Sequence, residues 1–531
     1  MLTNSSILTA TLLVPALGGL TIFLIPPLHA KKARHVALSV SVATLLLSIL
    51  AATRFNWNHV SYAAGDPSVQ LSARFEWLPS VGTQYFVGID GISLPLLLLT
   101  TSIGLMAIWA SYGISKSIKT YYALMLFLLA GAIGVFISLD LILFGLFFEG
   151  SLLPLLLLIG IWGGTKKEFA AIKCLLYALL GSIGTIMAIV GIYLHTRGMG
   201  DGGGAVFDVI RLATDPLIKS RLAFGGDSYH LGQIAFWLFF AGFAVRIPSV
   251  PLHSWLPDAH AESPTPLSMI LTAIMLPMGG YGLLRICYPL FPQQAADAWL
   301  YVAGIGIVSI VFGALVAMAQ KDFKRLVTFT GVSNMGYVVL GLSVMNPIAT
   351  EGAIFQLIAQ SISSALMFFV VGVLSDRARH REIRRFGGIW SQLPAYTGWA
   401  AVGFFASMGL PGLCGFVGQF LVLLGVFSSG DPASFLMHHT SGTAYVPLIW
   451  LGCIAAAAGI FTVGYLVWTL QRIYMGAPKQ EHHNFPGLTA SEKWILATLG
   501  LAAITLGIAP ALLLDHIRPA IDGMMRLVSG P

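Results

Sequence analysis

Long hydrophobic runs separated by short charged or Gly/Pro-rich links dominate this chain. Most runs reach the roughly 20 apolar residues that a helix needs to cross a bilayer. We count fourteen runs, near residues 6–26, 36–53, 89–112, 120–138, 140–162, 172–195, 231–255, 264–288, 298–318, 325–344, 352–374, 396–427, 446–470 and 492–513. The pattern predicts an all-α, polytopic membrane protein with about fourteen transmembrane helices.

The composition supports a membrane protein and argues against other classes. Of the 531 residues, 56% are hydrophobic and 10% are charged, whereas roughly a quarter of a soluble domain is charged. The runs leave no room for a soluble catalytic domain, so we expect no catalytic residues. The net charge is +7, but the basic residues do not form one patch with interleaved aromatic residues. This distribution argues against a nucleic-acid partner.

The basic residues instead predict the topology. An even number of helices places both termini on one side, and inward links are enriched in Lys and Arg. If both termini face outward, the inward links contain 19 of the 29 basic residues. The stretch from Met1 to Pro27 lacks a basic n-region and a small-residue cleavage site, so we interpret it as a retained first helix. The charge distribution therefore predicts that both termini face outward.

Two hydrophobic runs are long and interrupted. Residues 231–288 are interrupted by Pro248, Pro251, Pro257, Pro264 and Pro266, and residues 396–427 are interrupted by the stretch Gly409-Leu-Pro-Gly412. Proline breaks a helix, and lipid excludes the freed backbone groups unless protein or a water-filled cavity satisfies them. Breaks at corresponding places in two halves mark the transport path of many carriers. The second break comes five helices after the first, which fits an inverted five-helix repeat, but Pro and Gly are also frequent in ordinary membrane helices.

Two opposite charges lie deep inside apolar runs. Glu149 has more than seven apolar or small residues on either side, and Arg246 precedes Pro248 at the first break. An unpaired charge in hydrocarbon costs several kcal/mol, so each residue needs a partner. The sequence predicts that they are partners of each other. Two interpretations remain open: a functional pair on an ion path, or a static ion pair that joins two helices.

Metal and cofactor chemistry has little support. The cluster His253, Asp258, His260 and Glu262 follows the first break, but its spacing is not that of a zinc motif. Polar groups at a helix end ordinarily cap and solvate it. The four cysteines have neither zinc nor iron–sulfur spacing and are interpreted as packing residues: Cys174, Cys287, Cys414 and Cys453.

Two further polar stretches have simple interpretations. The stretch Lys321-Asp322-Phe-Lys324-Arg325 is most simply an inward link at the membrane surface. The Gly-rich stretch 198–206 lacks the preceding strand and following helix of a dinucleotide site. We therefore expect no cofactor in this chain.

Six longer blocks of the sequence are distinctive: GIDGISLPLLLLTT (88–101), FFEGSLLPLLLLIGIWGG (147–164), RIPSVPLHSWLPDAHAESPTPLSMIL (246–271), MGGYGLLR (278–285), KDFKRLVTFTGVSNMGYVVLG (321–341) and FASMGLPGLCGFVGQF (405–420). They closely resemble the antiporter-like M-type subunits of respiratory complex I, the proton-pumping NADH:quinone oxidoreductase. The resemblance extends from about residue 76 to the C-terminus, and the SVPLHSWLPDAH segment is highly specific for the wider antiporter-like superfamily. The IDGISLPL segment favours the M type over the L and N types.

The resemblance implies an architecture and a setting. It implies fourteen helices with two inverted five-helix repeats and two broken helices, in a bacterial cytoplasmic membrane. Expected partners are L- and N-type antiporter-like chains, while NADH, FMN, iron–sulfur clusters and quinone bind to other subunits. The implied division is an N-terminal three-helix segment (1–119), a first repeat (120–288), a second repeat (298–470) and a C-terminal helix with its tail (471–531).

The resemblance implies a line of polar residues within the membrane, the polar axis of the family, and this sequence retains only part of it. Glu149 matches the family's membrane glutamate, whereas Arg246 and Pro277 replace two lysines. Amides replace two histidines and a distal glutamate. The implied ion-translocation residues are Glu149, Arg246, His253, Lys324, Asn334, Gln360 and Gln419.

These replacements change the chemistry of the axis. A buried lysine can release its proton, whereas arginine keeps its charge and side-chain amides do not titrate. Our hypothesis is a retained scaffold whose own pumping is altered or lost. The alternatives are a subunit of a cation/proton antiporter, a subunit of an ion-pumping membrane hydrogenase, and a non-pumping structural spacer.

Overall fold

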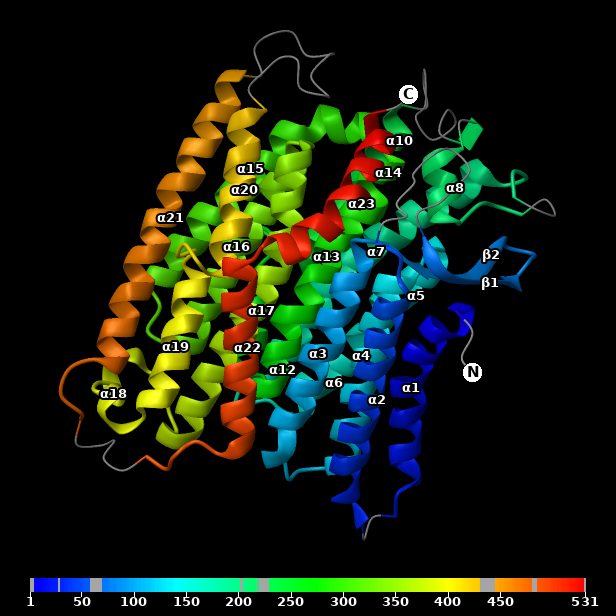
Figure 1. Ribbon diagram of the computed structural model, residues 1–531. Helices are drawn as coiled ribbons and strands as arrows, with labels where there is room; N and C mark the ends of the chain where they lie inside the picture. Colours follow the sequence, from blue (N-terminus) through cyan, green and yellow to red (C-terminus); the bar gives the residue numbers. More distant parts are fainter. Residues whose placement is uncertain are drawn as a thin grey trace. The chain divides into compact units, whose positions relative to one another are not determined.

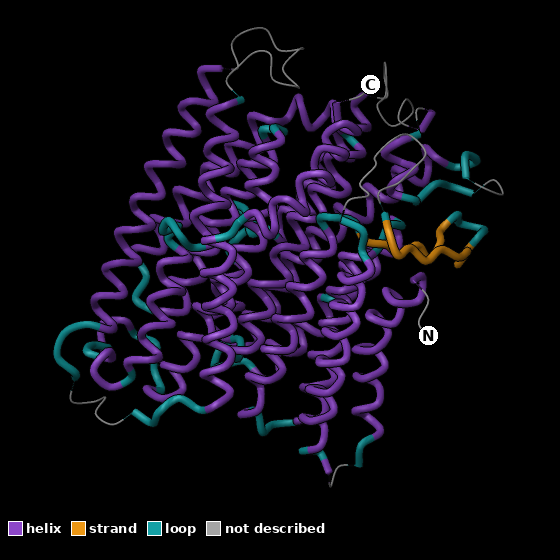
Figure 2. The backbone as a smooth tube through the Cα atoms, viewed as in Figure 1, coloured by secondary structure: helices purple, strands orange, loops and turns teal. Residues whose placement is uncertain are grey.

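The computed structural model is almost entirely helical (Figures 1 and 2). It describes residues 4–26, 29–57, 69–200, 204–215, 217–218, 229–429, 445–479 and 485–529. One two-stranded hairpin is the only sheet in these residues. The predicted all-α fold is therefore confirmed. Residues 201–203 of the Gly-rich stretch lie outside the described residues.

The elements fall before and after the first broken helix. The elements before it are α1 (Asn4–Leu24), α2 (Lys32–Arg54), β1 (Gln70–Leu78), β2 (Thr83–Ile89), α3 (Ser93–Ala110), η2 (Ser111–Gly113), α4 (Ile118–Ile137), α5 (Leu141–Gly150), α6 (Leu152–Trp162), α7 (Lys167–Thr196), α8 (Val209–Thr214) and α10 (Tyr229–Arg246). The elements after it are α11 (Trp255–Glu262), α12 (Thr265–Ile270), η5 (Leu271–Met275), α13 (Leu276–Gly282), η6 (Leu283–Cys287), α14 (Tyr288–Leu290), α15 (Pro292–Met318), α16 (Phe323–Ser343), α17 (Pro347–Ala378), η7 (Ile383–Arg385), α18 (Ile389–Gln392), α19 (Pro394–Ser407), α20 (Cys414–Ser428), α21 (Tyr445–Tyr474), α22 (Ala490–Ile508) and α23 (Ala511–Ser529).

The number and length of the apolar helices are those of a multi-pass membrane protein. Twelve helical segments in the described part of the chain are long and apolar enough to cross a bilayer. The two interrupted runs contribute shorter apolar helices, Gly232–Arg246 and Cys414–Ser428. Both predicted breaks are therefore present as interruptions of helical structure. The count of fourteen spans and the inverted repeats remain predictions.

The chain divides into two compact units. The first unit contains residues 1–247, 278–298 and 516–531, and the second contains residues 248–277 and 299–515. The boundary between Ile247 and Pro248 coincides with the first helix break. As a result, α10 belongs to the first unit, whereas α11 and α12 belong to the second.

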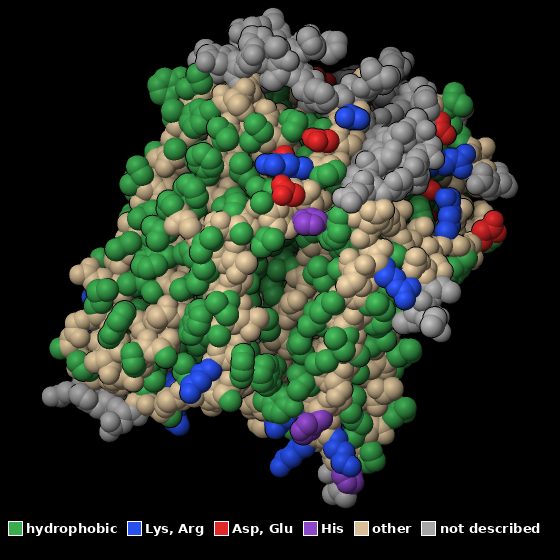
Figure 3. Space-filling model, in the orientation of Figure 1, with side chains coloured by type: hydrophobic (Ala, Val, Ile, Leu, Met, Phe, Trp, Pro, Cys, Tyr) green, Lys and Arg blue, Asp and Glu red, His purple; other side chains and the backbone are tan. Residues whose placement is uncertain are grey.

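The surface of the first unit carries many large apolar side chains. Helix α7 presents Leu176, Ile183 and Met187 outward, each more than half exposed. Its opposite face is buried and contains small or polar residues such as Ala178 and Ser182. Apolar outside and polar inside is the arrangement that lipid requires. Figure 3 likewise shows hydrophobic side chains over much of the visible face.

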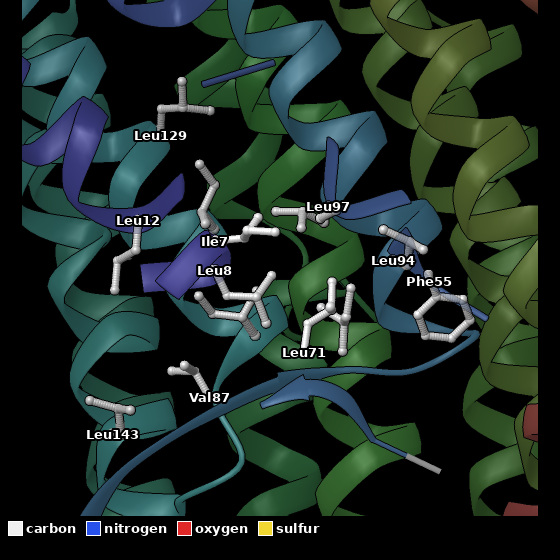
Figure 4. Packing of buried hydrophobic residues seen from close by; sticks show 14 residues of the cluster. Ile7, Leu8, Leu12, Phe55, Leu71, Val87, Leu94, Leu97, Leu129 and Leu143 are labelled. Atoms are coloured by element: carbon white, nitrogen blue, oxygen red, sulfur yellow. The ribbon is translucent and has the colours of Figure 1, made fainter. Parts of the chain in front are cut away.

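A cluster of buried aliphatic side chains joins the N-terminal helices of the first unit to its hairpin (Figure 4). Where the protein interior and the surrounding lipid are both apolar, close van der Waals packing is the main attraction between such groups. The cluster therefore fixes the hairpin against the helices. Its labelled members are Ile7, Leu8, Leu12, Phe55, Leu71, Val87, Leu94, Leu97, Leu129 and Leu143.

The sequence pattern does not predict this hairpin. Strands β1 and β2 pair antiparallel, with Arg74 opposite Phe86 and Phe75 opposite Tyr85. The turn requires Gly82, because its φ is +96° and a Cβ there would lie 2.2 Å from the carbonyl oxygen of Ala205. Six of the nine residues of β1 are exposed and three of these six are polar, so the stretch gives only a weak strand signal beside the long apolar runs.

Candidate functional site

Glu149 lies near the end of α5, just before the interruption at Ser151 that separates α5 from α6. Its side chain is partly buried. The hydroxyl of Ser182 donates a hydrogen bond to Glu149 Oε2. Ser182 lies on the buried face of α7 and is 9% exposed. The carboxylate is therefore anchored to α7 on one of its two oxygens.

Arg246 is the last residue of α10 and is almost fully buried, at 3% exposure. Its Nη2 donates a hydrogen bond of 2.7 Å to the carbonyl oxygen of Phe148. The guanidinium carbon also lies 4.6 Å from the centroid of the Phe148 ring. A backbone carbonyl and an aromatic face together hold the guanidinium, as cation–π geometry favours. Phe148 immediately precedes Glu149, so the two charges lie in one neighbourhood of the first unit.

No direct ion pair joins Glu149 to Arg246 among the described residues. Glu149 Oε1 and Arg246 Nη1 are both buried and have no hydrogen-bond partner. Each group instead bonds through its other polar atom. The geometry thus differs from that of a static ion pair in direct contact, because each charged group keeps one polar atom without a hydrogen-bond partner.

Lys324 occupies the first turn of α16 in the second unit. Asp322 caps this helix by accepting bonds from the backbone nitrogens of Lys324 and Arg325, at 2.8 and 3.1 Å. Arg325 is exposed and pairs with Asp258 at 3.0 Å. Lys324, in contrast, is only 4% exposed and lies inside the protein; the inward orientation of this link stays a prediction. The Nζ of Lys324 donates a 2.5 Å bond to the carbonyl oxygen of Ser263, which local sequence does not reveal.

His260 lies three residues before Ser263 and is fully buried. Its Nε2 is 3.1 Å from the hydroxyl oxygen of Thr272, and its ring stacks on Phe368 with centroids 4.3 Å apart. Its Nδ1 has no hydrogen-bond partner. Lys324 and His260 thus form a buried titratable region at one end of the second unit.

Three side-chain amides form a continuous hydrogen-bond chain in the second unit. Gln419 Nε2 donates to Asn334 Oδ1 at 3.0 Å, and Asn334 Nδ2 donates to Gln360 Oε1 at 2.7 Å. Gln360 Nε2 then donates to Ser364 Oγ at 2.5 Å. Helices α20, α16 and α17 supply the three amides. The structure therefore brings together three of the residues that, according to the resemblance, replace titratable groups.

The remaining predicted residues do not join this chain. His253 is 8% exposed and lies with its ring edge toward Phe312 and Phe329, at centroid distances of 4.9 and 6.2 Å. Pro277 is buried in α13, directly after the π-helical turn η5, where it supplies no hydrogen-bond donor. Within the described residues, no three His, Cys, Asp or Glu side chains are grouped to hold a metal ion.

The sequence pattern does not identify two residues that contact the charged pair, Ser182 and Phe148. Ser182 is one of many hydroxyls in apolar runs, and Phe148 is one of 32 phenylalanines. No local pattern distinguishes Ser182 from these other hydroxyls. Phe148 acts partly through its carbonyl oxygen, a group that every residue carries.

Comparison with known proteins gives concordant results. Residues 138–444 match the model of the family described as NADH:quinone oxidoreductase/Mrp antiporter, TM. A protein named NADH-quinone oxidoreductase subunit M from Rhodobacter capsulatus is 36% identical, over 94% of this chain and 92% of that protein. A protein of the same name from Rickettsia bellii is 32% identical over 98% of both chains. A chain of the solved structure of respiratory complex I from Thermus thermophilus with bound NADH superposes with a TM-score of 0.81 at 25% identity, over 98% of this chain and 100% of that one.

Proposed function

This chain belongs to the NADH:quinone oxidoreductase/Mrp antiporter membrane family, and on that premise we propose that it is the M-type, antiporter-like membrane-arm subunit of a complex I-type NADH:quinone oxidoreductase. The assembly couples electron transfer to proton translocation. This subunit carries no redox chemistry of its own. NADH, FMN, iron–sulfur clusters and quinone are assigned to other subunits.

The observation that carries the proposal is the pair of deep charges in the first unit. Maintaining Glu149 and Arg246 in a membrane helix bundle is costly and by default marks a functional region. Ser182 and the carbonyl oxygen of Phe148 hold these charges without closing them into one ion pair. A pair that served packing alone would gain more from direct contact, because attraction in a low-dielectric interior rises as the distance falls.

Arg246 holds a fixed charge in this arrangement. A lysine at this position would be able to release its proton, but a guanidinium stays protonated. The pair therefore supplies an electrostatic element of the scaffold rather than a two-sided proton relay. Together with the amides at 334, 360 and 419, this supports a subunit that retains its place in the assembly while its own pumping is altered or lost.

The setting follows from the same assignment. We place the subunit in a bacterial cytoplasmic membrane, next to L- and N-type antiporter-like chains. The charge bias of the links supports both termini on the outer side. The division into a three-helix segment, two inverted five-helix repeats and a C-terminal helix is retained as part of this proposal.

Purification of the native assembly tests the proposal. The chain, carrying an affinity tag, is isolated from its own membranes in mild detergent, and the accompanying chains are identified by mass spectrometry. We expect L- and N-type chains, chains that carry flavin and iron–sulfur clusters, and NADH oxidation by a quinone. An untagged strain carried through the same steps is the control.

The alternative is a cation/proton antiporter subunit, which the family description also covers. Under that alternative, the tagged chain co-purifies only with other antiporter chains, and the preparation does not oxidise NADH. Co-purification with a hydrogen-oxidising or hydrogen-producing enzyme would instead favour the membrane hydrogenase. Either result would overturn the assignment to an NADH:quinone oxidoreductase.

A further inference from the structure

We propose that the side-chain amides of Asn334, Gln360 and Gln419 form a proton barrier inside the second unit. The proposal deepens the proposed function, since it gives the altered pumping a physical location. It concerns the passage of protons through this chain alone.

The barrier rests first on the closed geometry of the amides. Asn334 and Gln360 are each 2% exposed. Asn334 accepts from Gln419 and donates to Gln360, and its Nδ2 also lies 3.3 Å from the carbonyl oxygen of Ser407. Gln360 accepts from Asn334 and donates to Ser364. Every polar side-chain atom of these two buried amides therefore has a protein partner.

The chemistry of amides prevents this chain from relaying a proton. A relay group must accept a proton on one side and release one on the other, as histidine or a carboxylate does. An amide NH₂ only donates and an amide oxygen only accepts, and neither titrates in the physiological range. The hydrogen bonds run in one direction, from Gln419 through Asn334 and Gln360 to Ser364. A proton that arrived at either end would find no group along this chain that can carry it.

The barrier also does not recruit water. Buried waters bind where buried polar groups lack protein partners, and Asn334 and Gln360 offer no such atom. By contrast, Glu149 Oε1, Arg246 Nη1 and His260 Nδ1 are buried and have none. Gln356 Oε1, one turn before Gln360 on α17, is also buried without a partner. The segment that we infer to be dry is therefore limited to Asn334 and Gln360.

The location of the amides explains what they would block. Thr272, which contacts His260, lies next to the amide chain. A Cβ built on Gly331 would be 3.9 Å from Thr272 Cγ2 and 3.3 Å from Gln360 Nε2. The titratable region of Lys324 and His260 thus leads toward Gln360. At the other end of the chain, Gln419 is partly exposed, so the amides separate the titratable region from the surface reached by Gln419.

Passive proton flux through the purified full-length chain tests the barrier. Liposomes that contain the chain and internal K⁺ are diluted into Na⁺ buffer, and valinomycin then generates a potential that is negative inside. A trapped pH dye reports proton entry. We expect the wild-type chain to match protein-free liposomes. We expect the triple variant Asn334→His/Gln360→His/Gln419→Glu to admit protons at least about tenfold faster, because titratable groups lower the barrier to transfer.

A matched variant separates titration from loosened packing. Gln360→Leu breaks the two hydrogen bonds of Gln360, to Asn334 and to Ser364, but introduces no titratable group, so its flux should stay at the wild-type level. Leak through Gln360→Leu equal to that of the triple variant would overturn the proposal. A triple variant that keeps the wild-type thermal midpoint but stays at the wild-type flux would also overturn it.

The wild-type measurement guards against a triple variant that does not fold. Flux through the wild-type chain that rises above the protein-free level in proportion to protein overturns the barrier whatever the variants do. The double variant Asn334→His/Gln360→His, which leaves Gln419 unchanged, is then measured in place of the triple variant against the same tenfold expectation. The assay needs no partner chain, so its outcome is independent of which chains co-purify with this one.

Discussion

Arg246 bonds to the backbone of the residue next to Glu149 rather than to the Glu149 carboxylate. Its Nη2 lies 2.7 Å from the carbonyl oxygen of Phe148, while the carboxylate accepts its bond from Ser182. A carbonyl oxygen does not titrate, so the position of the guanidinium does not depend on the protonation of Glu149. The arrangement keeps a fixed positive charge beside a carboxylate in the first unit.

Removal of the buried guanidinium should destabilise the protein. Arg246→Gln loses a hydrogen bond from a charged donor and leaves Glu149 without its nearby charge, which should cost about 2–3 kcal/mol. Arg325→Gln is the control, because Arg325 forms an exposed ion pair at 3.0 Å worth about 0.2–1 kcal/mol. Unfolding in detergent by heat or denaturant measures both. Equal losses for the two variants would show that Phe148 does not hold Arg246 as described.

The hydroxyl of Ser182 should matter more than an ordinary helix serine. Ser182→Ala removes the hydrogen bond to Glu149 and leaves both oxygens of this partly buried carboxylate without a partner, at a cost of about 1–3 kcal/mol. Ser41→Ala in α2 is the comparison, since Ser41 is buried but only donates to the carbonyl oxygen of Leu38 at 2.9 Å. Such local bonds contribute little. A Ser182→Ala midpoint as high as that of Ser41→Ala would count against the anchoring of Glu149.

The second helix break depends on a glycine. Gly409 has φ +75°, and a Cβ there would lie 2.3 Å from Gln419 Oε1. Gly409→Ala should therefore cost at least about 1–2 kcal/mol in the left-handed conformation, and it should displace Gln419 from Asn334. Gly464→Ala in α21 meets nothing within 4 Å and should be neutral or stabilising by about 0.5–1 kcal/mol. Equal changes in the thermal midpoint for Gly409→Ala and Gly464→Ala would refute this role of Gly409.

A buried ion pair should stabilise the first unit. Arg285 Nη1 lies 2.9 Å from Asp90 Oδ2, with side-chain exposures of 11% and 1%. Arg285→Gln leaves the aspartate buried without its charged partner and should cost about 3–5 kcal/mol. Arg211→Gln, whose pair with Asp215 is longer and more exposed at 3.8 Å, should cost less than about 1 kcal/mol. Chemical unfolding of the purified variants measures the difference, and a small loss at Arg285 would contradict it.

The sequence predicts those features that local patterns determine. Prolines and glycines identify both helix breaks, and a charge among apolar neighbours singles out Glu149 and Arg246. The partner of each charge depends on how α5, α7 and α10 rotate against one another, which no local pattern specifies. The charged neighbours of Lys324 favour a link at the membrane surface, whereas the resemblance implies an ion-translocation role. The structure buries its amine against the carbonyl oxygen of Ser263.

The amide chain shows the same limit. The resemblance identifies residues 334, 360 and 419 as replacements, but only the packing of α16, α17 and α20 reveals that their side chains bond to one another. The hairpin is missed for a different reason, because its strands are short and partly polar beside the apolar runs. Chemistry was therefore predictable residue by residue, whereas connectivity was not.

We infer that this subunit belongs to a proton-translocating assembly but does not itself pass protons. The number of protons moved per NADH oxidised is the most direct test of this inference. The ratio is measured in vesicles with the wild-type assembly and with Glu149→Gln, and the exposed Glu168→Gln in α7 is the control. We predict the same ratio for all three, because the proposed amide barrier would interrupt the path through this chain. A large loss of protons per NADH in Glu149→Gln, with Glu168→Gln unchanged, would contradict the account and show that this subunit pumps.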